Sequence, residues 1–597
     1  MKRLPCLLLL AGAALARADL GYTVQASPET GLLHVTLKIP GTTSGAKLQM
    51  PNWAPGAYVL TDNFNRVKNL KATDGEGRTL TINRTSEFWT KEYGDAPARG
   101  SQKNEIVTWE VEPAKTTVVE YDVDTGVTDG AMHWSGPSSY MYPVGRTQEK
   151  CTLSIKLPEG WNAYLGLLAK NGVYTAATYD VLADNPVTAG GDLLVDTYTV
   201  RGKPHTIVMR GAPKSGVDRA YLIKACKFVS ESQGNFFGGL PYDCYVWHFS
   251  VNNAADGAGG LEHLSSTQIG LAKGVGPRAV SVLSHEFFHL WNVKRVRSKA
   301  LGPFDYTKLP QTGALWWLEG VTDYYASRIL FTDGWWAEDL FFKSIGSNVN
   351  TVRNTDSRTQ VSIYDCSLRT DEANNGRGNS NGYRGSYYNR GWVAGMMLDI
   401  EVRAHTGGKK SLDDVERVLW QQCKDDQPGF PEDGIRQALV KVGGTDMGRV
   451  YDDIVMKPGD PDVERSLSQV GLMIGEVDEA FTDVGFAWSV SDGAAKVTSV
   501  SGPATGKLEV GDAITAINGT EVSGSVPQIG RILGGALNQA KVGETIKLSV
   551  KRGGETVAVD VVPANGTRKA KAITRDPKAT PAQKSLGAAW LKQKKLG

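Results

Sequence analysis

Residues 285–297 read HEFFHLWNVKRVR, and the spacing of the two histidines in this stretch decides how the middle of the chain must fold. His285 and His289 stand four residues apart in a segment, 278–297, whose apolar residues recur at helical spacing. Residues four apart on an α-helix lie one above the other, so both imidazoles would face one side and could bind one metal ion. Glu286 lies about 100° around the helix from His285, which places it beside such an ion without binding it.

A third metal ligand is expected from a second segment with helical spacing, residues 314–331. Glu319 lies in this segment, thirty residues after His289. Two histidines and one glutamate leave the fourth position of a tetrahedral Zn²⁺ open for water, which is the arrangement of catalytic zinc sites and not of structural ones. We therefore predict one Zn²⁺ per chain at these three residues, with Glu286 next to its bound water.

Asp323 follows Glu319 by one turn of the predicted helix. Its carboxylate could accept a hydrogen bond from a ligand imidazole and so fix the tautomer and orientation of that ring. A solvated charge, or an ion pair with Arg328, is the alternative. For the histidines, the alternative is a helix with two hydrogen-bonded imidazoles and a surface glutamate. With eight histidines in 597 residues, the pattern arises by chance about once in a hundred such chains.

The first 18 residues predict a signal peptide. Lys2 and Arg3 precede an apolar run from Leu4 to Leu15, and Ala-Arg-Ala follows at residues 16–18. This arrangement is typical of a secretory leader, and the run is too short to span a bilayer. Since no later stretch reaches the length and apolarity of a membrane helix, no membrane span is expected, and the protein is expected to be periplasmic or secreted.

Two different apolar periods predict an all-β domain over residues 19–212 and a mainly α domain over residues 213–460. Apolar residues at positions 33–39 alternate with polar ones, which is the period of a half-buried strand, and turn residues separate such runs. A β-sandwich-like domain is the natural interpretation. In the second region, segments such as 278–297, 314–331 and 390–405 are rich in Leu, Val, Trp and Met at helical spacing.

A third domain is predicted over residues 466–565. Leu508 to Ile514, followed by Ile517 to Val522, resembles the Leu-x-x-Gly-Asp-x-Ile and Ile-Asn-Gly-x-x-Val core of PDZ domains; an ordinary small β domain is the alternative. Such a domain could take a protein C-terminus as its ligand. Residues 566–597 hold nine basic residues and one acid without a sustained apolar face, so a basic, disordered tail is expected.

Charge and cysteine content exclude few further classes of function. The 66 Lys and Arg residues nearly balance the 64 Asp and Glu residues, so no nucleic acid partner is expected. Residues 1–18 carry +3 and residues 566–597 carry +8, so the total of +2 leaves −9 for the body of the protein. Five cysteines follow the leader, and this odd number permits one or two disulfides without indicating their pairing.

Taken together, the sequence resembles the glycyl aminopeptidase family of zinc (gluzincin) metallopeptidases. The resemblance rests on Pro51 to Tyr58, on His285 to Arg297, on Glu319 to Thr322 and on the PDZ core. It implies a multidomain fold: an all-β N-terminal domain, a mainly α thermolysin-like catalytic domain and a small β-rich PDZ domain. It also implies an aminopeptidase that releases N-terminal glycine or other small residues from peptides with a free N-terminus.

The resemblance also suggests a group that binds the substrate. Gly259 to His263 is similar to the Gly-x-Met-Glu-Asn element of related aminopeptidases, in which the glutamate holds the free amine of the substrate. Glu262 would take that role, with Gly259 and Gly260 beside the substrate, although Leu261 and His263 depart from the element. A turn glutamate without contact to substrate is the alternative.

A tyrosine is expected to stabilise the oxyanion. Tyr388 to Gly391 is similar to the Tyr-x-Lys-Gly element whose tyrosine has this role in the same relatives, while Tyr387 and Tyr383 lie close by in the sequence and a role in core packing is the alternative. The implied mechanism has zinc lower the pKa of its bound water to about 7 while Glu286 takes the proton and returns it to the leaving amine. The competing hypotheses are a PDZ-assisted zinc endopeptidase and a non-catalytic peptide-binding protein.

Overall fold

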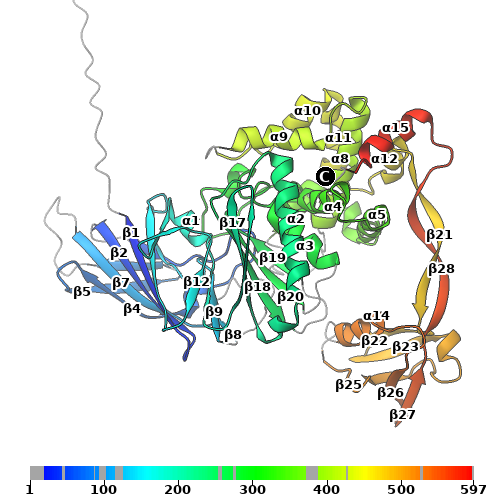
Figure 1. The fold of residues 1–597 in the computed structure, drawn as a ribbon, viewed down its shortest axis with the longest axis horizontal. Helices are drawn as coiled ribbons and strands as arrows, with labels where there is room; N and C mark the ends of the chain where they lie inside the picture. The colour runs from blue at the N-terminus through cyan, green and yellow to red at the C-terminus, as the bar shows by residue number, and fades with distance from the viewer. Residues whose placement is uncertain are drawn as a thin grey trace, which may run out of the picture. The chain divides into compact units, whose positions relative to one another are not determined.

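The structure is a computed structural model, shown in Figure 1, that describes residues 19–42, 47–86, 88–92, 103–113, 126–128, 130–252, 258–272, 277–370, 387–424, 428–524 and 529–593. The predicted signal peptide, residues 1–18, lies outside these ranges. Contacts divide the chain into a large unit, residues 1–341, 347–470 and 584–597, and a small unit, residues 342–346 and 471–583. Across the described ranges, no helix combines the length and apolarity needed to cross a membrane.

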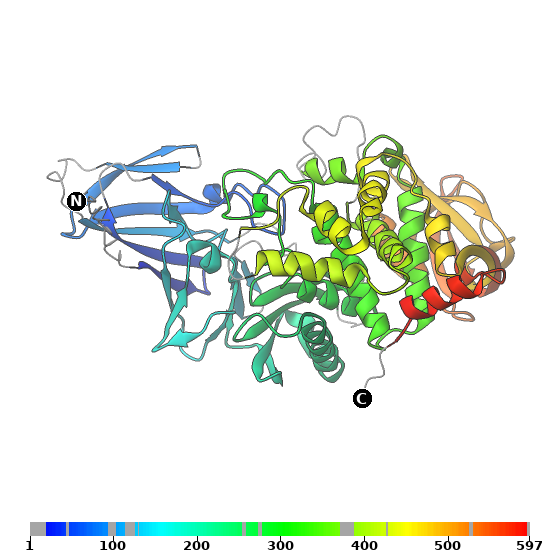
Figure 2. The ribbon, with the colours of Figure 1, turned by 90° about the horizontal axis from the view of Figure 1, so that it is seen from above.

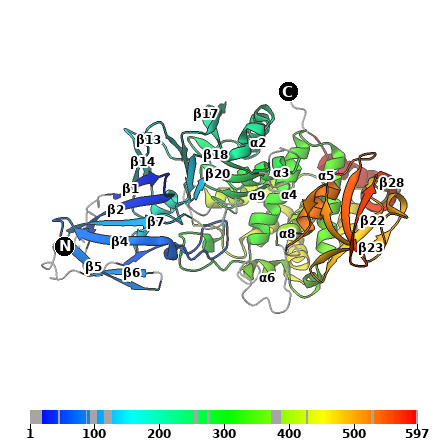
Figure 3. The same ribbon diagram turned by 90° about the horizontal axis from the view of Figure 1, so that it is seen from below.

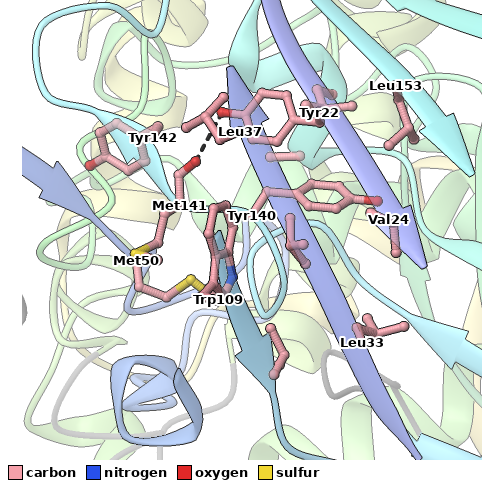
Figure 4. Packing of buried hydrophobic residues seen from close by; sticks show 14 of the residues in the cluster. Tyr22, Val24, Leu33, Leu37, Met50, Trp109, Tyr140, Met141, Tyr142 and Leu153 are labelled. Carbon is pink, nitrogen blue, oxygen red and sulfur yellow. Dashed lines mark hydrogen bonds between the residues drawn. The ribbon is translucent and has the colours of Figure 1, made fainter. Parts of the chain in front are cut away.

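The large unit begins with an eleven-stranded sheet, which confirms the prediction of an all-β N-terminal region. In spatial order its strands are β10 (Tyr142–Pro143), β3 (Lys47–Gln49), β6 (Phe88–Glu92), β5 (Thr79–Thr85), β4 (Val67–Asp74), β7 (Lys103–Val111), β2 (Leu32–Thr42), β1 (Leu20–Ser27), β11 (Cys151–Lys156), β14 (Val173–Ala176) and β13 (Ala169–Lys170). The alternation at positions 33–39 places Leu33 and Leu37 of β2 in the core, where Figure 4 shows them with Trp109 and Tyr140. The same figure shows the Tyr22 hydroxyl donating to the Met141 carbonyl.

Two further sheets connect this region to the helices. The first consists of β12 (Asn162–Tyr164), β15 (Val187–Gly190), β9 (Ala131–Trp134) and β8 (Gly126–Thr128), with α1 (Tyr179–Ala183) next to it in sequence. The second is a mixed sheet in the order β16 (Leu194–Val200), β17 (Lys203–Arg210), β18 (Tyr245–Asn252), β20 (Ser266–Ala272) and β19 (Ala258–Glu262). Because β17 and β18 pair in parallel, this sheet runs across the domain boundary predicted at residues 212 and 213.

Helices form the rest of the large unit and include the predicted α-rich region. They are α2 (Arg219–Phe237), α3 (Pro277–Phe288), α4 (Thr322–Thr332), α5 (Glu338–Arg353), α6 (Ile363–Leu368), α8 (Tyr387–His405), α9 (Leu412–Cys423), α10 (Gly434–Gly443), α11 (Asp446–Tyr451) and α12 (Val463–Gln469). Figure 3 shows α2 and α3 beside the mixed sheet. The Asp218 carboxylate caps the start of α2, and Gly238, with φ of 81°, ends it. None of the five cysteines of the described residues takes part in a disulfide.

The small unit contains a β-rich fold that confirms the expected position of the PDZ-like core. Its main sheet includes β22 (Phe486–Ser491), β23 (Ala494–Val500), β24 (Ala513–Ile517), β26 (Ile546–Arg552) and β27 (Glu555–Val561), with β25 (Thr520–Glu521) paired to β24 and α14 (Gly535–Asn538) following a π-helical turn. Leu508, Ile514, Ile517 and Val522, all from the PDZ-like motif, are buried in one cluster.

The predicted disordered tail over residues 566–597 is wrong for its described part. Residues 564–575 form β28 (Ala564–Arg575), which pairs along its length with β21 (Leu472–Asp483). Basic side chains of β28 meet acidic ones of β21, as in the 2.7 Å ion pair between Lys569 and Asp478. A basic strand is stable here because an acidic strand lies opposite it, and composition alone does not reveal that partner.

The chain then forms α15 (Pro581–Trp590) and returns to the large unit through Trp590, which is fully buried. Its indole N–H donates to Asp399 Oδ2 at 3.1 Å and lies 3.2 Å from the Tyr324 hydroxyl. The Arg328 guanidinium donates to the Trp590 carbonyl at 3.2 Å. Figure 2 shows α15, in red, against the green and yellow helices.

Replacement of Trp590 by alanine should destabilise the large unit by about 3–5 kcal/mol, because it leaves a cavity the size of an indole and removes a partner of the buried Asp399. The exposed neighbour Lys592 provides the control, and Lys592→Ala should change the free energy of unfolding by no more than about 0.5 kcal/mol. Urea denaturation followed by circular dichroism measures both. An unchanged unfolding midpoint in Trp590→Ala would mean that the tail is not anchored.

Candidate functional site

His285 and His289 lie at the C-terminal end of α3. His285 occupies its last turn, and the backbone N–H of His289 still bonds to the His285 carbonyl at 3.3 Å, so the helical geometry continues through both residues. Their Nε2 atoms are 2.8 Å apart. The predicted pair of imidazoles on one helix face is therefore present.

Glu319 reaches the same point from a π-helical turn, Trp316–Val321, that immediately precedes α4. The regular α-helix expected over residues 314–331 is thus wider at its start, a feature that frequently accompanies functional sites. Glu319 Oε2 lies 3.2 Å from His289 Nε2 and 3.5 Å from His285 Nε2. Close packing fixes this turn, because a Cβ on Gly391 of α8 would lie 2.1 Å from the Trp316 carbonyl oxygen.

Both imidazoles are oriented by acceptors on their other nitrogen. His285 Nδ1–H donates to Asp323 Oδ1 at 2.8 Å, and His289 Nδ1–H donates to the Asn292 carbonyl at 2.6 Å. Asp323 therefore lies where the sequence predicted, and Arg328, the alternative partner, pairs with Asp399 instead. These acceptors leave both Nε2 lone pairs facing Glu319, as metal ligation requires.

The residues fit a bound Zn²⁺. One ligand atom each from His285, His289 and Glu319 lies within 4.8 Å of the others, and all three side chains are buried. Glu319 Oε1 is buried without a hydrogen-bond partner, an arrangement that costs free energy unless a cation or water satisfies it. Burial by itself would raise the pKa of Glu319, but His289 and His285 lower it to about 2, so this carboxylate is ionised. Two imidazoles and a carboxylate are typical zinc ligands.

Glu286 faces the same space from the adjacent position on α3. A Cβ on Gly260 would lie 2.4 Å from Glu286 Oε1, so only glycine fits there against the carboxylate. Glu286 Oε2 is buried without a hydrogen-bond partner. Burial raises the pKa of Glu286 to about 7, against the opposing effect of the two histidines. A carboxylate with a pKa in this range is suited to accept and return a proton near neutral pH.

A cavity of about 310 Å³ opens onto these side chains. Its lining comes from a loop of the N-terminal region, from β19, from α3 and the residue that follows it, from the π-helical turn and from the start of α8. It consists of Gly56, Ala57, Tyr58, Val59, Gly260, Leu261, Glu262, His285, Glu286, His289, Glu319, Tyr387 and Tyr388. Gly259, which precedes Gly260 on β19, is not one of the lining residues. The β-rich N-terminal region and the region that carries the helices therefore both contribute residues to the cavity.

The loop 56–59 was missed as a part of the site by sequence reasoning. Its motif supported only a family resemblance, yet Gly56 has φ of 104° and Tyr58 has φ of 49°, both in the left-handed region. A Cβ on Gly56 would lie 2.6 Å from Glu262 Oε1. The glycine was the available signal, because a close approach of backbone to another group requires its missing side chain.

Tyr388 and Tyr387 open α8 and both line the cavity. The Tyr388 ring lies 6.2 Å from the His285 ring, and the two tyrosine rings stack at 4.9 Å. Burial, reinforced by the charge of Glu319, raises the pKa of Tyr388 well above its usual value. Its phenol therefore stays protonated and can donate a hydrogen bond. The third candidate, Tyr383, lies outside the described residues.

Models of known families match three parts of the chain. M61 glycyl aminopeptidase matches residues 278–394, the Peptidase M61 N-terminal domain matches residues 21–191, and the PDZ domain matches residues 482–562. These matches confirm the predicted family resemblance and its order of domains. No curated protein sequence matches significantly.

Solved structures resemble the chain as well. An aminopeptidase N family protein from Idiomarina loihiensis, 22% identical with a TM-score of 0.74, aligns over 96% of this chain and 100% of its own, and shows that the fold is shared. An M1 zinc metallopeptidase from Deinococcus radiodurans is 14% identical, with a TM-score of 0.46 over 74% of this chain and 94% of its own.

Asp323→Asn should weaken Zn²⁺ binding about 10- to 100-fold, because the amide no longer provides the charged acceptor that orients His285. Competition with a chelator of known affinity measures the change. Asp339→Asn, on the exposed face of α5, is the control and should bind Zn²⁺ as the unmodified protein does. Equal affinity in all three proteins would contradict the role of Asp323.

Proposed function

This chain carries the N-terminal and catalytic domains of the M61 glycyl aminopeptidase family together with a PDZ domain, and on that basis we propose that it is a zinc-dependent aminopeptidase. The family matches make it a metallopeptidase. Beyond that assignment, we propose that the metal is zinc, that the enzyme removes single N-terminal residues, and that it prefers glycine or other small residues.

The position of Glu262 is the observation that carries this proposal. One ligand atom each from Glu262, Glu286 and His289 lies within 4.8 Å of the others, so a third carboxylate faces the metal ligands across the cavity. Glu262 is 4% exposed, and its Oε1 has no hydrogen-bond partner. Oε1 of this buried carboxylate makes no hydrogen bond and lies 3.8 Å from Lys294 Nζ, too far for one, so Glu262 is suited to bind a substrate ammonium group.

This arrangement favours an exopeptidase. If the ammonium group of the first residue binds Glu262, the carbonyl that reaches the metal ligands is that of the same residue. A longer N-terminal extension would have to pass the loop 56–59, where the space beside Glu262 does not admit even a Cβ on Gly56, which would lie 2.6 Å from Oε1. The substrates would therefore be peptides with a free N-terminus.

Proton transfer is assigned to Glu286. When bound, a divalent cation at the three ligands would polarise a water molecule and the scissile carbonyl. Glu286 would accept the proton of the attacking water and return it to the leaving amine, since its carboxylate faces the cavity without another partner. The Tyr388 hydroxyl would donate to the oxygen that becomes negative in the tetrahedral intermediate.

The PDZ domain keeps an endopeptidase as the second candidate. A groove beside an edge strand of such a domain can bind an extended protein C-terminus and bring long substrates to the chain. A non-catalytic peptide-binding role is disfavoured by Glu286, because a binding protein has no need of a partnerless carboxylate next to the metal ligands. We also propose export, from residues 1–18, which N-terminal sequencing of the purified protein would check.

Glu286→Gln should retain Zn²⁺ and lose roughly 10²- to 10⁴-fold in kcat, the usual range for a lost general base. Metal analysis and peptide cleavage assays measure the two effects. Glu416→Gln is the matched control, because Glu416 is also buried in the large unit but does not line the cavity. Burial raises the pKa of Glu416 to about 8, so a neutral amide replaces a neutral carboxyl there and activity should be unchanged. Full activity of Glu286→Gln would refute the mechanism.

Cleavage should depend strictly on a free N-terminus, and Glu262→Gln should reduce kcat/KM for such peptides about 10- to 100-fold. The reason is the loss of a charge-assisted contact worth about 1.5–3 kcal/mol. Assays of a small peptide and its N-acetylated form, side by side, measure both effects. Rapid cleavage of the acetylated peptide would favour the endopeptidase instead.

A further inference from the structure

Lys294 places a buried ammonium group beside Glu262. It follows His289 by five residues and is 8% exposed. Its Nζ lies 2.9 Å from Asp184 Oδ1 and 3.8 Å from Glu262 Oε1. Burying an ammonium group costs several kcal/mol unless carboxylates surround it, so this position is built to hold a cation between two anions.

Asp184 fixes the ammonium group from the N-terminal region. It ends α1, and besides Lys294 it accepts from the backbone N–H of Leu264 at 2.7 Å and from His263 Nδ1 at 3.1 Å. Burial opposes ionisation of Asp184, but Lys294 and His263 lower its pKa to about 2. The shorter contact is to Asp184, so this carboxylate holds Lys294 in place while Nζ stays 3.8 Å from Glu262 Oε1.

The backbone before Lys294 is strained. Val293 has φ of 134°, a region that a β-branched residue rarely adopts. This conformation lies between the Asn292 carbonyl, which accepts from His289, and Lys294, which reaches Glu262. Strain of this kind persists where surrounding contacts enforce it, and here it connects the orientation of a metal ligand to that of the proposed substrate anchor.

Glu262 has little else to hold its carboxylate. Oε1 is buried without a hydrogen-bond partner, and its close neighbours include the backbone of Gly56. A glutamate side chain has three rotatable bonds, so packing against a glycine leaves the carboxylate direction weakly defined. The ammonium group of Lys294 supplies a fixed electrostatic direction from one side.

We propose that Lys294, held by Asp184, is a positioning residue that aims the Glu262 carboxylate at the amine of the substrate. This inference rests on the proposed aminopeptidase function and extends it, because it makes amine recognition depend on the N-terminal region. A purely structural Lys294 would bridge Asp184 to the turn after α3 without affecting recognition of the amine. The two roles therefore predict different affinity ratios for a pair of inhibitors with and without an amine. A change in the stability of the protein does not alter this ratio.

The test compares two small inhibitors, glycine hydroxamate and acetohydroxamate, which differ only in the amine. The ratio of their inhibition constants measures recognition of the amine, and it should be about 10 or more in the unmodified protein. Lys294→Met, which keeps the chain length without the charge, should bring the ratio close to 1 while Zn²⁺ content stays the same. Lys294→Arg should restore part of it.

Lys214→Met is the matched control. Lys214 is equally buried and pairs with Asp192 at 2.9 Å, but it does not line the cavity, so the ratio should not change. If Lys294→Met does not fold, the double variant Asp184→Asn/Lys294→Met answers the same question, because removing both members of a buried pair is far better tolerated than removing one.

The outcomes separate this inference from the function on which it rests. A ratio that stays at its original value in Lys294→Met, or in the double variant, while Glu262→Gln abolishes it, would overturn the role of Lys294 alone. A ratio unaffected by Glu262→Gln would overturn the amine anchor itself. A ratio that falls in both Lys294→Met and Glu262→Gln, and not in Lys214→Met, supports the inference.

Discussion

The close approach of His285, His289 and Glu319 is the constraint on which the rest of the large unit depends. Three side chains that would each be costly to bury alone converge at the end of α3 and at the π-helical turn before α4. Neighbouring groups hold them there: Asp323 and the Asn292 carbonyl orient the rings, and the Asn292 side chain donates to the Trp317 carbonyl and the Thr322 hydroxyl at 3.0 Å each. Asn292 thus connects the two segments that carry the proposed metal ligands.

The N-terminal region takes part in the same site. Gly56 and Tyr58 line the cavity, and Asp184 holds Lys294, whose Nζ lies 3.8 Å from Glu262 Oε1. Since the mixed sheet also runs across the predicted boundary between the two regions, the β-rich part is continuous with the part that carries His285, His289 and Glu319. This continuity explains why a glutamate on an edge strand, β19, can be held at a fixed distance from ligands on a helix.

Local patterns were sufficient to predict that His285, His289 and Glu319 come together, and to predict much of the fold. The four-residue spacing of His285 and His289 determines their common direction on any α-helix, and the alternation along β2 determines which side chains are buried. The PDZ-like core could also be predicted from the sequence, because its glycines and apolar residues form a continuous motif. Family resemblance then identified Glu262 and Tyr388, which the structure places at the cavity.

What sequence could not predict depends on partners distant in the chain. The backbone carbonyl of Asn292 has no signature in a sequence, and Lys294 gains meaning only when Asp184 lies beside it. The C-terminal tail looked disordered because β28 has few apolar residues. Its partners are distant in the chain: β21 precedes β28 by about a hundred residues, and Asp399 precedes Trp590 by 191 residues. Non-local pairing of this kind is not encoded in periodicity or composition.

A crystal structure of the Zn²⁺-loaded protein, with anomalous scattering recorded at the zinc edge, tests the central claim most directly. We expect one ion per chain, bound by the Nε2 atoms of His285 and His289 and by the Glu319 carboxylate at about 2.0–2.2 Å. The second group of potential ligands, Glu262, Glu286 and His289, provides a sharp alternative. An ion bound there would occupy both the proposed general base and the proposed amine anchor, and would contradict the account.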